Sequence, residues 1–372
     1  MDQTPFKTRS KLLSVYRDHV LSIRSGGNPF PVQLEVNIND SCSQNCGWCI
    51  SENVRNNPTR LDLSNASLKQ FFNDFKRLGG QSLVWSGGGE PTSHPDFSDA
   101  LALVGETGLA QGLMTHGAFN KKLIDPIARH CEWVRMSVDT SVGEEYARRR
   151  GASVREFEMV FRNARALVEK GIKVGFCINV ADWNRSRIKP LFKLAENTGV
   201  DYLQVRPVLP TPFLHKSTDK SELLNMDSIP DLLIELSKMQ TIRNHEGPQL
   251  IISQDKFADL QAIQRAGGDF GYQGCASHNL FVVLNCDGNL SVCMYHLFDQ
   301  RYVFGNVYQN SLEEIWTSEQ RRMVVAHCKG GQRGLNHTLH SCQVCCKGHE
   351  INKVLLALEL DNEIEKPISG FL

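Results

Sequence analysis

Twelve of the 372 residues are cysteines, and three of them share one short segment. Cys42, Cys46 and Cys49 occur in the sequence CSQNCGWC with the spacing C-x3-C-x2-C. Three thiolates on such a loop can bind three irons of a cubane cluster, which leaves the fourth iron open to a small molecule. A structural zinc loop is the alternative. It would need a fourth ligand, for which the distant His94 and His116 are candidates.

A second group of cysteines lies in the last third of the chain. Cys275 and Cys293 follow the pattern C-x12-G-x4-C, and Cys342 and Cys345 form a C-x2-C pair. Four such thiolates can converge on one tetrahedral site, which suits either a structural zinc or an iron–sulfur cluster. Three further cysteines are rival ligands for this site: Cys286, Cys328 and Cys346.

The segment 86–91, SGGGEP, has a composition suited to ligand binding. Consecutive glycines allow a close approach of the backbone to a ligand, and Glu90 supplies a carboxylate that can pair with an ammonium group. The segment lacks the pattern G-x-x-x-x-G-K-[ST], so a phosphate-binding P-loop is not supported.

The overall charge and hydropathy exclude several classes of protein. The chain carries 41 Lys plus Arg and 41 Asp plus Glu, so neither a nucleic acid nor an anionic membrane is an expected partner. The first residues lack the features of an export signal, and apolar runs such as 280–284 are far shorter than the roughly 18 residues of a membrane span. We therefore expect a cytoplasmic protein, in which clustered cysteines are metal ligands or redox groups rather than disulfides.

Between about residues 31 and 209, short β-rich runs alternate with longer amphipathic runs. Six β/α units in series require parallel strands with right-handed crossovers, which predicts an α/β doubly wound sheet or partial barrel. We expect the chemistry at the carboxyl ends of the strands, where the three-cysteine loop and SGGGEP begin. The predicted strands are 32–38, 82–85, 111–114, 133–138, 173–180 and 202–208, and the predicted helices are 68–78, 96–106, 121–130, 154–170 and 185–197.

The remainder of the chain divides into four parts. Residues 1–30 form an N-terminal extension, and 210–270 are predicted to be a connector with helices near 229–239 and 256–265. In 271–350, apolar runs flank Asp287-Gly288, which predicts a β-hairpin, and a helix is predicted over 312–322. Residues 351–372 are predicted to form a C-terminal helix and tail.

The three-cysteine loop, with Trp48 before its last cysteine, is followed about 40 residues later by GGEP. This combination resembles the radical S-adenosylmethionine (radical SAM) superfamily over roughly residues 31–209. The resemblance implies a partial (β/α)6 barrel in which the three cysteines hold a 4Fe-4S cluster and SAM chelates its open iron. It also implies that Gly88, Gly89 and Glu90 bind the SAM amino group and that Trp48 lies near the adenine.

Further matches to the family concern the fourth, fifth and sixth predicted strands. The sequence RMSVD at 135–139 resembles the family's R-x-S-x-D, in which the serine and a downstream arginine contact the SAM carboxylate. This assigns Ser137 together with Arg149 from the run 148–150, for which a solvated helix end is the alternative. Asn179 and Arg206 stand at positions that often reach the ribose or adenine. THG at 115–117 replaces the family's usual Thr-Asn-Gly.

The second cysteine group is similar to the twitch domain, the shortened form of the SPASM extension of radical SAM enzymes. A full SPASM domain has further cysteines after the C-x2-C pair, and here only Cys346 follows. The resemblance therefore implies one auxiliary 4Fe-4S cluster, held by Cys275, Cys293, Cys342 and Cys345.

The resemblance implies that a reductant such as flavodoxin or ferredoxin drives cleavage of SAM to a 5′-deoxyadenosyl radical, which abstracts hydrogen from a substrate C–H. Because twitch relatives act on small hydroxylated molecules, the expected substrate is a sugar, cyclitol or nucleoside. A peptide-modifying SPASM enzyme is the alternative, and a non-catalytic zinc or iron–sulfur protein is an alternative of another class. Cys177 is a candidate hydrogen donor to a product radical, although packing in the core is the usual role of such a cysteine.

Overall fold

In the computed structural model, a single sheet of ten strands organises the part of the chain that is described. That part comprises residues 15–51, 61–208, 221, 223–241, 247–266, 274–297, 299–329 and 347–361. The strand order is β10-β9-β8-β1-β2-β3-β4-β5-β6-β7. The strands are β1 (Gln33–Asn37), β2 (Ser82–Ser86), β3 (Ala110–Thr115), β4 (Trp133–Ser137), β5 (Lys173–Val180), β6 (Tyr202–Pro207), β7 (Gln249–Ile252), β8 (Phe281–Leu284), β9 (Asn289–Ser291) and β10 (Val303–Asn306).

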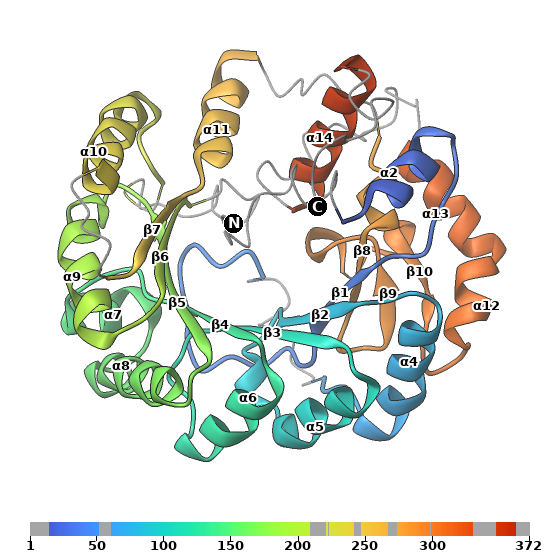
Figure 1. Cartoon of the computed structure of the whole chain (residues 1–372), viewed down its shortest axis with the longest axis horizontal. Coiled ribbons are helices and arrows are strands. Elements are labelled where there is room, and N and C mark those ends of the chain that lie inside the picture. Colours follow the sequence, from blue (N-terminus) through green and yellow to red (C-terminus); the bar gives the residue numbers. More distant parts are fainter. Residues whose placement is uncertain are drawn as a thin grey trace, which may run out of the picture.

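The strands β1 to β6 follow one another in the chain and in the sheet, and each pairs in parallel with the next. Figure 1 shows them curving into a partial barrel with helices on the outer side. The predicted α/β partial barrel is therefore confirmed. The helices of the barrel region are α2 (Arg17–Arg24), α4 (Asn65–Arg77), α5 (Phe97–Thr107), α6 (Ile124–His130), α7 (Gly143–Arg150), α8 (Val154–Glu169), α9 (Ile188–Thr198), α10 (Ile229–Thr241) and α11 (Gln254–Ala266).

Alternation along each strand separates a packed outer face from an accessible inner face. On β4, Val134 and Met136 are completely buried in the hydrophobic core shared with the helices. Arg135 and Ser137 point the other way and remain partly exposed. The inner face of β4 thus carries polar side chains that solvent or a ligand can reach.

Two aromatic rings fill the amino-terminal end of the barrel, and each packs over a glycine of the neighbouring strand. A Cβ on Gly112 would lie 2.2 Å from the ring of Trp133, and a Cβ on Gly175 would lie 2.0 Å from the ring of Tyr202. No side chain larger than hydrogen fits at either glycine without displacing the ring. These two rings, which we call the floor, therefore cover the inner face of the sheet at the start of β4 and β6.

The C-terminal region is part of the same sheet rather than a separate layer. β8 pairs in parallel with β1, from Gln33 opposite Phe281 to Val36 opposite Leu284, and β9 and β10 continue antiparallel. The predicted hairpin around Asp287-Gly288 is formed by β8 and β9. Three helices complete this region: α12 (Leu312–Thr317), α13 (Glu319–Lys329) and α14 (Lys347–Asp361).

Three local predictions differ from the structure. Residues 210–270, predicted as a connector, contribute β7, which pairs in parallel with β6. The single helix predicted over 312–322 is two helices, because Ser318 has an extended backbone and its Oγ accepts a hydrogen bond from Arg321 N at 3.0 Å to begin α13. The helix α7 was not predicted, since its sequence, GEEYARRR, has little apolar periodicity.

Charged contacts join α11 to α14 on the side of the barrel between β7 and β8 (Figure 1). Asp259 on α11 contacts Lys353, and its Oδ2 lies 3.2 Å from Nε2 of His349. Lys256 forms a further ion pair with Glu350. In the described residues no strand bridges β7 and β8, and these two helices contact each other on this side of the barrel.

Candidate active site

The three-cysteine loop leaves β1 at its carboxyl end, as predicted. Cys42, Cys46 and Cys49 are each partly buried and form no disulfide. Cys49 N donates to Cys46 O at 3.2 Å, and the sulfur of Cys42 accepts a hydrogen bond from Gln44 N at 3.4 Å. Burial and the nearby Glu90 raise the pKa of Cys42 to about 12, so its thiol must lose a proton when iron binds.

These three thiols suit an iron–sulfur cluster, because they are accessible soft donors on one loop. Within the described residues, no three His, Cys, Asp or Glu side chains already converge as a metal site. The assignment of the cluster ligands therefore rests on the motif and on the position of the loop.

A buried arginine on α7 fixes the conformation of the cysteine loop. Arg150 Nη1 donates to Gln44 Oε1 at 2.6 Å, and Gln44 Nε2 donates to the hydroxyl of Tyr146 at 2.7 Å. The backbone of the loop is held as well, because Asn45 N donates to Arg150 O at 2.6 Å. Arg150 retains only 3 % of its accessible surface. The end of α7 thus serves as the support for the loop.

The charge of Arg150 is balanced by Asp139, which follows β4. Both Nε and Nη2 of Arg150 donate to Asp139 Oδ2, at 3.1 and 2.5 Å. The other oxygen, Oδ1, accepts from Asn179 N at 2.8 Å and from Asn179 Nδ2 at 3.3 Å. Asp139 therefore links the cysteine loop to the carboxyl end of β5.

The segment SGGGEP docks directly against the start of the cysteine loop. Gly89 N donates to Asn39 O at 3.0 Å, Glu90 N donates to Ser41 O at 2.8 Å, and Asn39 Nδ2 donates to Glu90 O at 3.0 Å. A Cβ on Gly89 would lie 2.2 Å from Asn39 Oδ1 and 2.5 Å from Ser41 N. Gly89 is therefore required for the two segments to approach.

The Glu90 carboxylate is buried and held by four donors. Oε1 accepts from Thr92 N, from the Thr92 hydroxyl and from the Thr115 hydroxyl, at 3.2, 2.6 and 2.6 Å, and Oε2 accepts from His116 N at 2.8 Å. Such a fixed negative charge is suited to bind an ammonium group.

His116 takes the place of the family's usual asparagine and lies between Glu90 and the cysteine loop. Its Nδ1 accepts a hydrogen bond from Ala118 N, so the proton of the neutral ring lies on Nε2. This nitrogen is 3.3 Å from the Ser43 hydroxyl and 3.7 Å from Glu90 Oε2. Burial lowers the pKa of His116 despite the nearby Glu90, which keeps the ring neutral near pH 7. His116 therefore helps to position Glu90 without neutralising it.

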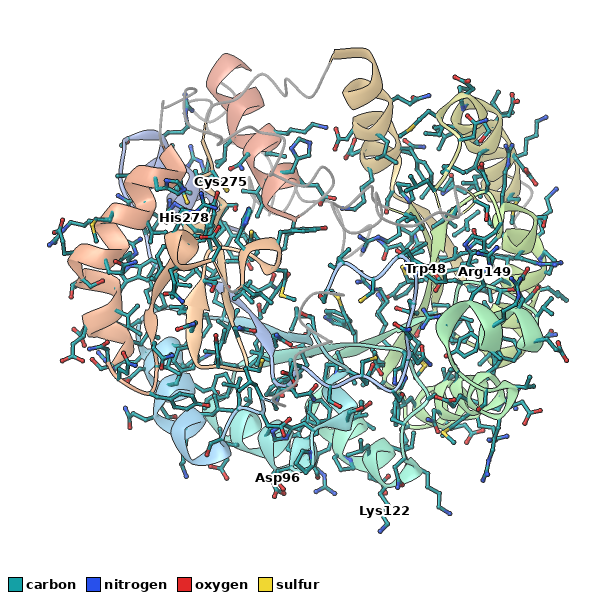
Figure 2. The ribbon with its side chains drawn as sticks, turned by 180° about the vertical axis from the view of Figure 1, so that it is seen from behind. Trp48, Asp96, Lys122, Arg149, Cys275 and His278 are labelled. Carbon is teal, nitrogen blue, oxygen red and sulfur yellow. The ribbon has the colours of Figure 1, made fainter. Side chains whose placement is uncertain are left out.

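Trp48 and Arg149, both predicted to contact SAM, lie on the same side of the barrel (Figure 2), and each contacts the ring of Trp183. The rings of Trp48 and Trp183 are 5.3 Å apart, and the guanidinium of Arg149 lies 5.0 Å from the Trp183 ring centre. Arg149 Nη2 also donates to Ser221 Oγ at 3.3 Å. The predicted contact of Arg149 with the SAM carboxylate stays a prediction. It is Arg150, the next residue, that reaches the cysteine loop.

The other predicted residues share the inner face of β4, β5 and β6. Ser137 is opposite Cys177, and Asn179 is opposite Arg206. Cys177 is buried, with an exposed fraction of 2 %. Burial raises the pKa of its thiol, although the charges of Arg135 and Arg206 lower it. A protonated thiol therefore faces the barrel interior.

Only part of the predicted auxiliary site lies in the described residues. Cys275 Sγ accepts a hydrogen bond from Asn352 Nδ2 at 3.3 Å, and Cys275 N donates to the backbone oxygen of Cys328 at 2.8 Å. Cys286 lies elsewhere, with its sulfur 3.9 Å from Asn37 Nδ2. Cys293 begins the short helical turn after β9 and is partly buried. Cys342, Cys345 and Cys346 are outside the described residues.

Sequence reasoning missed Asn37, Asn39 and Gln44, which position the site. It placed Asp139 in the R-x-S-x-D match and Arg150 in the run 148–150, but it gave neither residue the positioning role that the structure shows. The pattern N-x-N before the cysteine loop was an available signal for the first two. Arg150 could not be distinguished from its two arginine neighbours by sequence.

Two protein families match the chain. The radical SAM superfamily matches residues 36–195, and the iron–sulfur cluster-binding SPASM domain matches residues 275–346. This chain is a radical SAM enzyme with a C-terminal SPASM domain. The cofactors of this radical SAM enzyme are SAM, a SAM-binding 4Fe-4S cluster and an auxiliary iron–sulfur cluster, as expected.

Curated relatives of this radical SAM enzyme are distant. The tungsten-containing aldehyde ferredoxin oxidoreductase cofactor-modifying protein of Pyrococcus furiosus is 22 % identical over 77 % of this chain and 81 % of its own length. The Fe-coproporphyrin III synthase of Methanosarcina barkeri is 23 % identical over 80 % of this chain and 76 % of its own length.

Solved structures share the fold at similarly low identity. SuiB of Streptococcus suis, bound to S-adenosylmethionine, has a TM-score of 0.64 and 16 % identity, covering 84 % of this chain and 71 % of SuiB. The enzyme anSMEcpe with bound AdoMet has a TM-score of 0.62 and 16 % identity, covering 81 % of this chain and 84 % of anSMEcpe. In the described part of this chain no helix is both long and apolar enough to cross a membrane.

Proposed function

We propose that this radical SAM enzyme modifies a peptide by removing a hydrogen atom from a C–H bond of one residue. The catalytic part of the proposal is carried by the docking of SGGGEP on the cysteine loop through Asn39, which joins an ammonium-binding carboxylate to the cluster ligands. When bound, the cluster supplies the electron that cleaves SAM, and the resulting radical takes the hydrogen atom.

The peptide part of the proposal is supported by the relatives of similar fold. SuiB has been solved with the precursor peptide SuiA at a TM-score of 0.63, and anSMEcpe with bound AdoMet and the Kp18Cys peptide at 0.61. The inner face of this barrel, with half-buried polar residues above the ring floor, provides a wall for such a substrate. The substrate expected from the sequence, a small hydroxylated molecule, has less support. Such molecules are therefore tested beside peptides in the experiment below.

The residues have distinct roles in this proposal. Glu90 binds the SAM ammonium group, with Gly88 and Gly89 presenting their backbone to SAM. Trp48 lies near the adenine. The assigned further contacts to SAM are Ser137, Arg149, Asn179 and Arg206.

Cys177 is proposed to return a hydrogen atom to a product radical, since its protonated thiol faces the interior. The S–H bond breaks as the product C–H bond forms, and one electron from the external reductant with one proton restores the thiol from the thiyl radical. In D₂O, the wild type should then incorporate solvent deuterium into its product through the exchangeable Cys177 thiol, and the Cys177→Ala variant should incorporate less. Unchanged turnover and product stereochemistry in this variant would exclude the role.

The test is anaerobic reconstitution followed by assay with a reductant and SAM. Peptides encoded beside the gene form one arm, and sugars, cyclitols and nucleosides form the other. We expect about eight irons per chain, with 5′-deoxyadenosine formed alongside a peptide of changed mass. Formation of 5′-deoxyadenosine with the small molecules alone would refute the peptide assignment. Zinc in place of iron would refute the whole proposal.

A further inference from the structure

Two arginines on the inner face of the barrel lack an acidic partner among the described residues. Arg135 on β4 donates from Nη1 to Gln204 Oε1 at 3.2 Å and from Nη2 to the sulfur of Met114 at 2.8 Å. Both acceptors are neutral. Arg206 on β6 has a buried Nε with no hydrogen-bond partner. An arginine side chain is always charged, so this wall carries two positive charges that its contacts do not balance.

The acidic residues near this wall are already engaged. Asp139 is bound by Arg150 and Asn179, and Glu90 accepts hydrogen bonds from the segment that follows it and from 115–116. On the opposite wall, Glu35 Oε1 lies 3.8 Å from Lys347 Nζ. None of these carboxylates contacts Arg135 or Arg206 in the described part of the chain.

The depth of Arg135 separates it from the predicted SAM site. It precedes Ser137 by two residues, which is about 7 Å along a strand, and it pairs in register with Gly175, whose missing side chain accommodates the Tyr202 ring of the floor. Arg135 therefore lies just above the floor, below the carboxyl ends of the strands where the cysteine loop and SGGGEP meet. A group bound there would belong to the substrate rather than to SAM.

We infer that the substrate carries an anionic group, a carboxylate or a phosphate, which binds Arg135 near the floor of the barrel. Arg206, which is opposite Asn179 at the carboxyl end of the strands and is assigned to SAM, adds positive charge to the same wall without being part of this substrate contact. Guanidinium groups donate paired hydrogen bonds to either anion. The inference rests on the proposed function of the same site, and it names the feature by which a peptide substrate would be recognised: an acidic or phosphorylated side chain.

The test measures binding to the reconstituted, SAM-saturated enzyme, so that the SAM carboxylate is already bound. The probes are blocked pentapeptides, Ala-Ala-X-Ala-Ala, in which X is Glu, Gln or phosphoserine, and a second pair, glucuronate and glucose. We expect the Glu or the phosphoserine peptide to bind at least about tenfold more tightly than the Gln peptide. The better of the two identifies the anion.

Variants decide whether Arg135 is responsible. R135Q should abolish the preference for the anion and R135K should restore most of it, while iron content and SAM affinity report that both variants are folded. R165Q, at an exposed position of α8, is the matched control and should retain the preference.

The outcomes separate this inference from the proposed function. Equal binding of the Glu, Gln and phosphoserine peptides, a preference that persists in R135Q, or no binding of any anionic probe would overturn the inference. A preference for glucuronate over glucose that is lost in R135Q, with no peptide bound, would support the inference and contradict the peptide proposal.

Discussion

Asn37 Nδ2 donates a hydrogen bond to Asn285 Oδ1 at 2.6 Å, with both side chains fully buried. Asn37 is the last residue of β1, and Asn285 directly follows β8 in the SPASM region. The other amide atom, Asn37 Oδ1, accepts from Gly88 N at 2.6 Å. Because a backbone N–H can only donate, the orientation of the Asn37 amide is fixed. The SPASM hairpin therefore supports the glycine segment proposed to bind SAM.

Asn285→Ala should weaken SAM binding without loss of either cluster. The substitution leaves the buried Asn37 Nδ2 with only the weak acceptor Cys286 Sγ at 3.9 Å, which costs about 1–3 kcal/mol and loosens the Asn37 side chain that positions Gly88. SAM affinity and iron content of the reconstituted enzyme are the measurements. Asn306→Ala is the control, since among the described residues the hydrogen bonds of the Asn306 side chain stay within the C-terminal region: it donates to Asp287 O and Asn289 Oδ1 and accepts from Tyr308 N. Equal SAM affinity in both variants would contradict the relationship.

Arg150→Met should destabilise the protein by about 3–5 kcal/mol, because Asp139 is left as an unpaired buried charge. The free energy of unfolding in denaturant measures this effect, and iron content measures the loss of support for the cysteine loop. The double variant Arg150→Met, Asp139→Asn should recover much of the stability but not the loop, since Gln44 still lacks its donor. Arg148→Met, at an exposed position of the same helix, should change neither quantity. An Arg150→Met variant as stable as the wild type would refute the role of Arg150 in balancing the buried charge of Asp139.

Gly89→Ala should abolish SAM binding, because the added methyl would collide with Asn39 Oδ1 and the backbone of Ser41. The clashing atoms of Ser41 belong to its main chain and cannot rotate away as a side chain could. The clash is therefore relieved only if SGGGEP moves away from the cysteine loop. We expect a loss of SAM affinity of more than about tenfold, equivalent to at least 1.4 kcal/mol. At Gly143, the nearest atom to an added Cβ is a side-chain methyl at 3.1 Å, so Gly143→Ala is the control. Normal SAM binding by Gly89→Ala would show that the contact is not required.

Cys275→Ser and Cys328→Ser distinguish a ligand of the auxiliary cluster from its neighbour. Cys275 is the predicted ligand, and Cys328 contacts its backbone N–H. Cys275→Ser should lose about four irons per chain, whereas Cys328→Ser should retain all of them. If only Cys328→Ser lost iron, Cys328 would be the ligand of the auxiliary cluster and Cys275 would not.

Most of the fold could be predicted from the sequence, because each strand and helix is indicated by residues close together in the chain. Strand 173–180 was predicted with the bounds that the structure shows, since apolar strand residues and flanking glycines mark it clearly. The four-residue strand β7 was not predicted from the sequence, because such a short apolar run is also compatible with a helix. Its place in the sheet depends on pairing with β6, which is a property of the assembled sheet.

Residues of the site could be predicted from the sequence only where they belong to a recognisable motif. The cysteines and Glu90 follow from spacing and composition, but the choice of Arg149 over Arg150 was a choice among identical neighbours. The geometry of α7 turns Arg150 inward to Asp139 and places Arg149 over Trp183. Asn37 and Asn285 are 248 residues apart in the chain, so their hydrogen bond depends on the pairing of β1 with β8.

Transfer of deuterium from a peptide to 5′-deoxyadenosine would show that this enzyme takes a hydrogen atom from a peptide. The reconstituted enzyme would be incubated with a reductant, SAM and a peptide that carries deuterium at all of its Cα and side-chain carbons, and the 5′-deoxyadenosine would be analysed by mass spectrometry. We expect one deuterium atom in this product with the wild type and no deuterium with the variant that lacks Cys42, Cys46 and Cys49. Modified peptide accompanied by unlabelled 5′-deoxyadenosine would contradict this expectation.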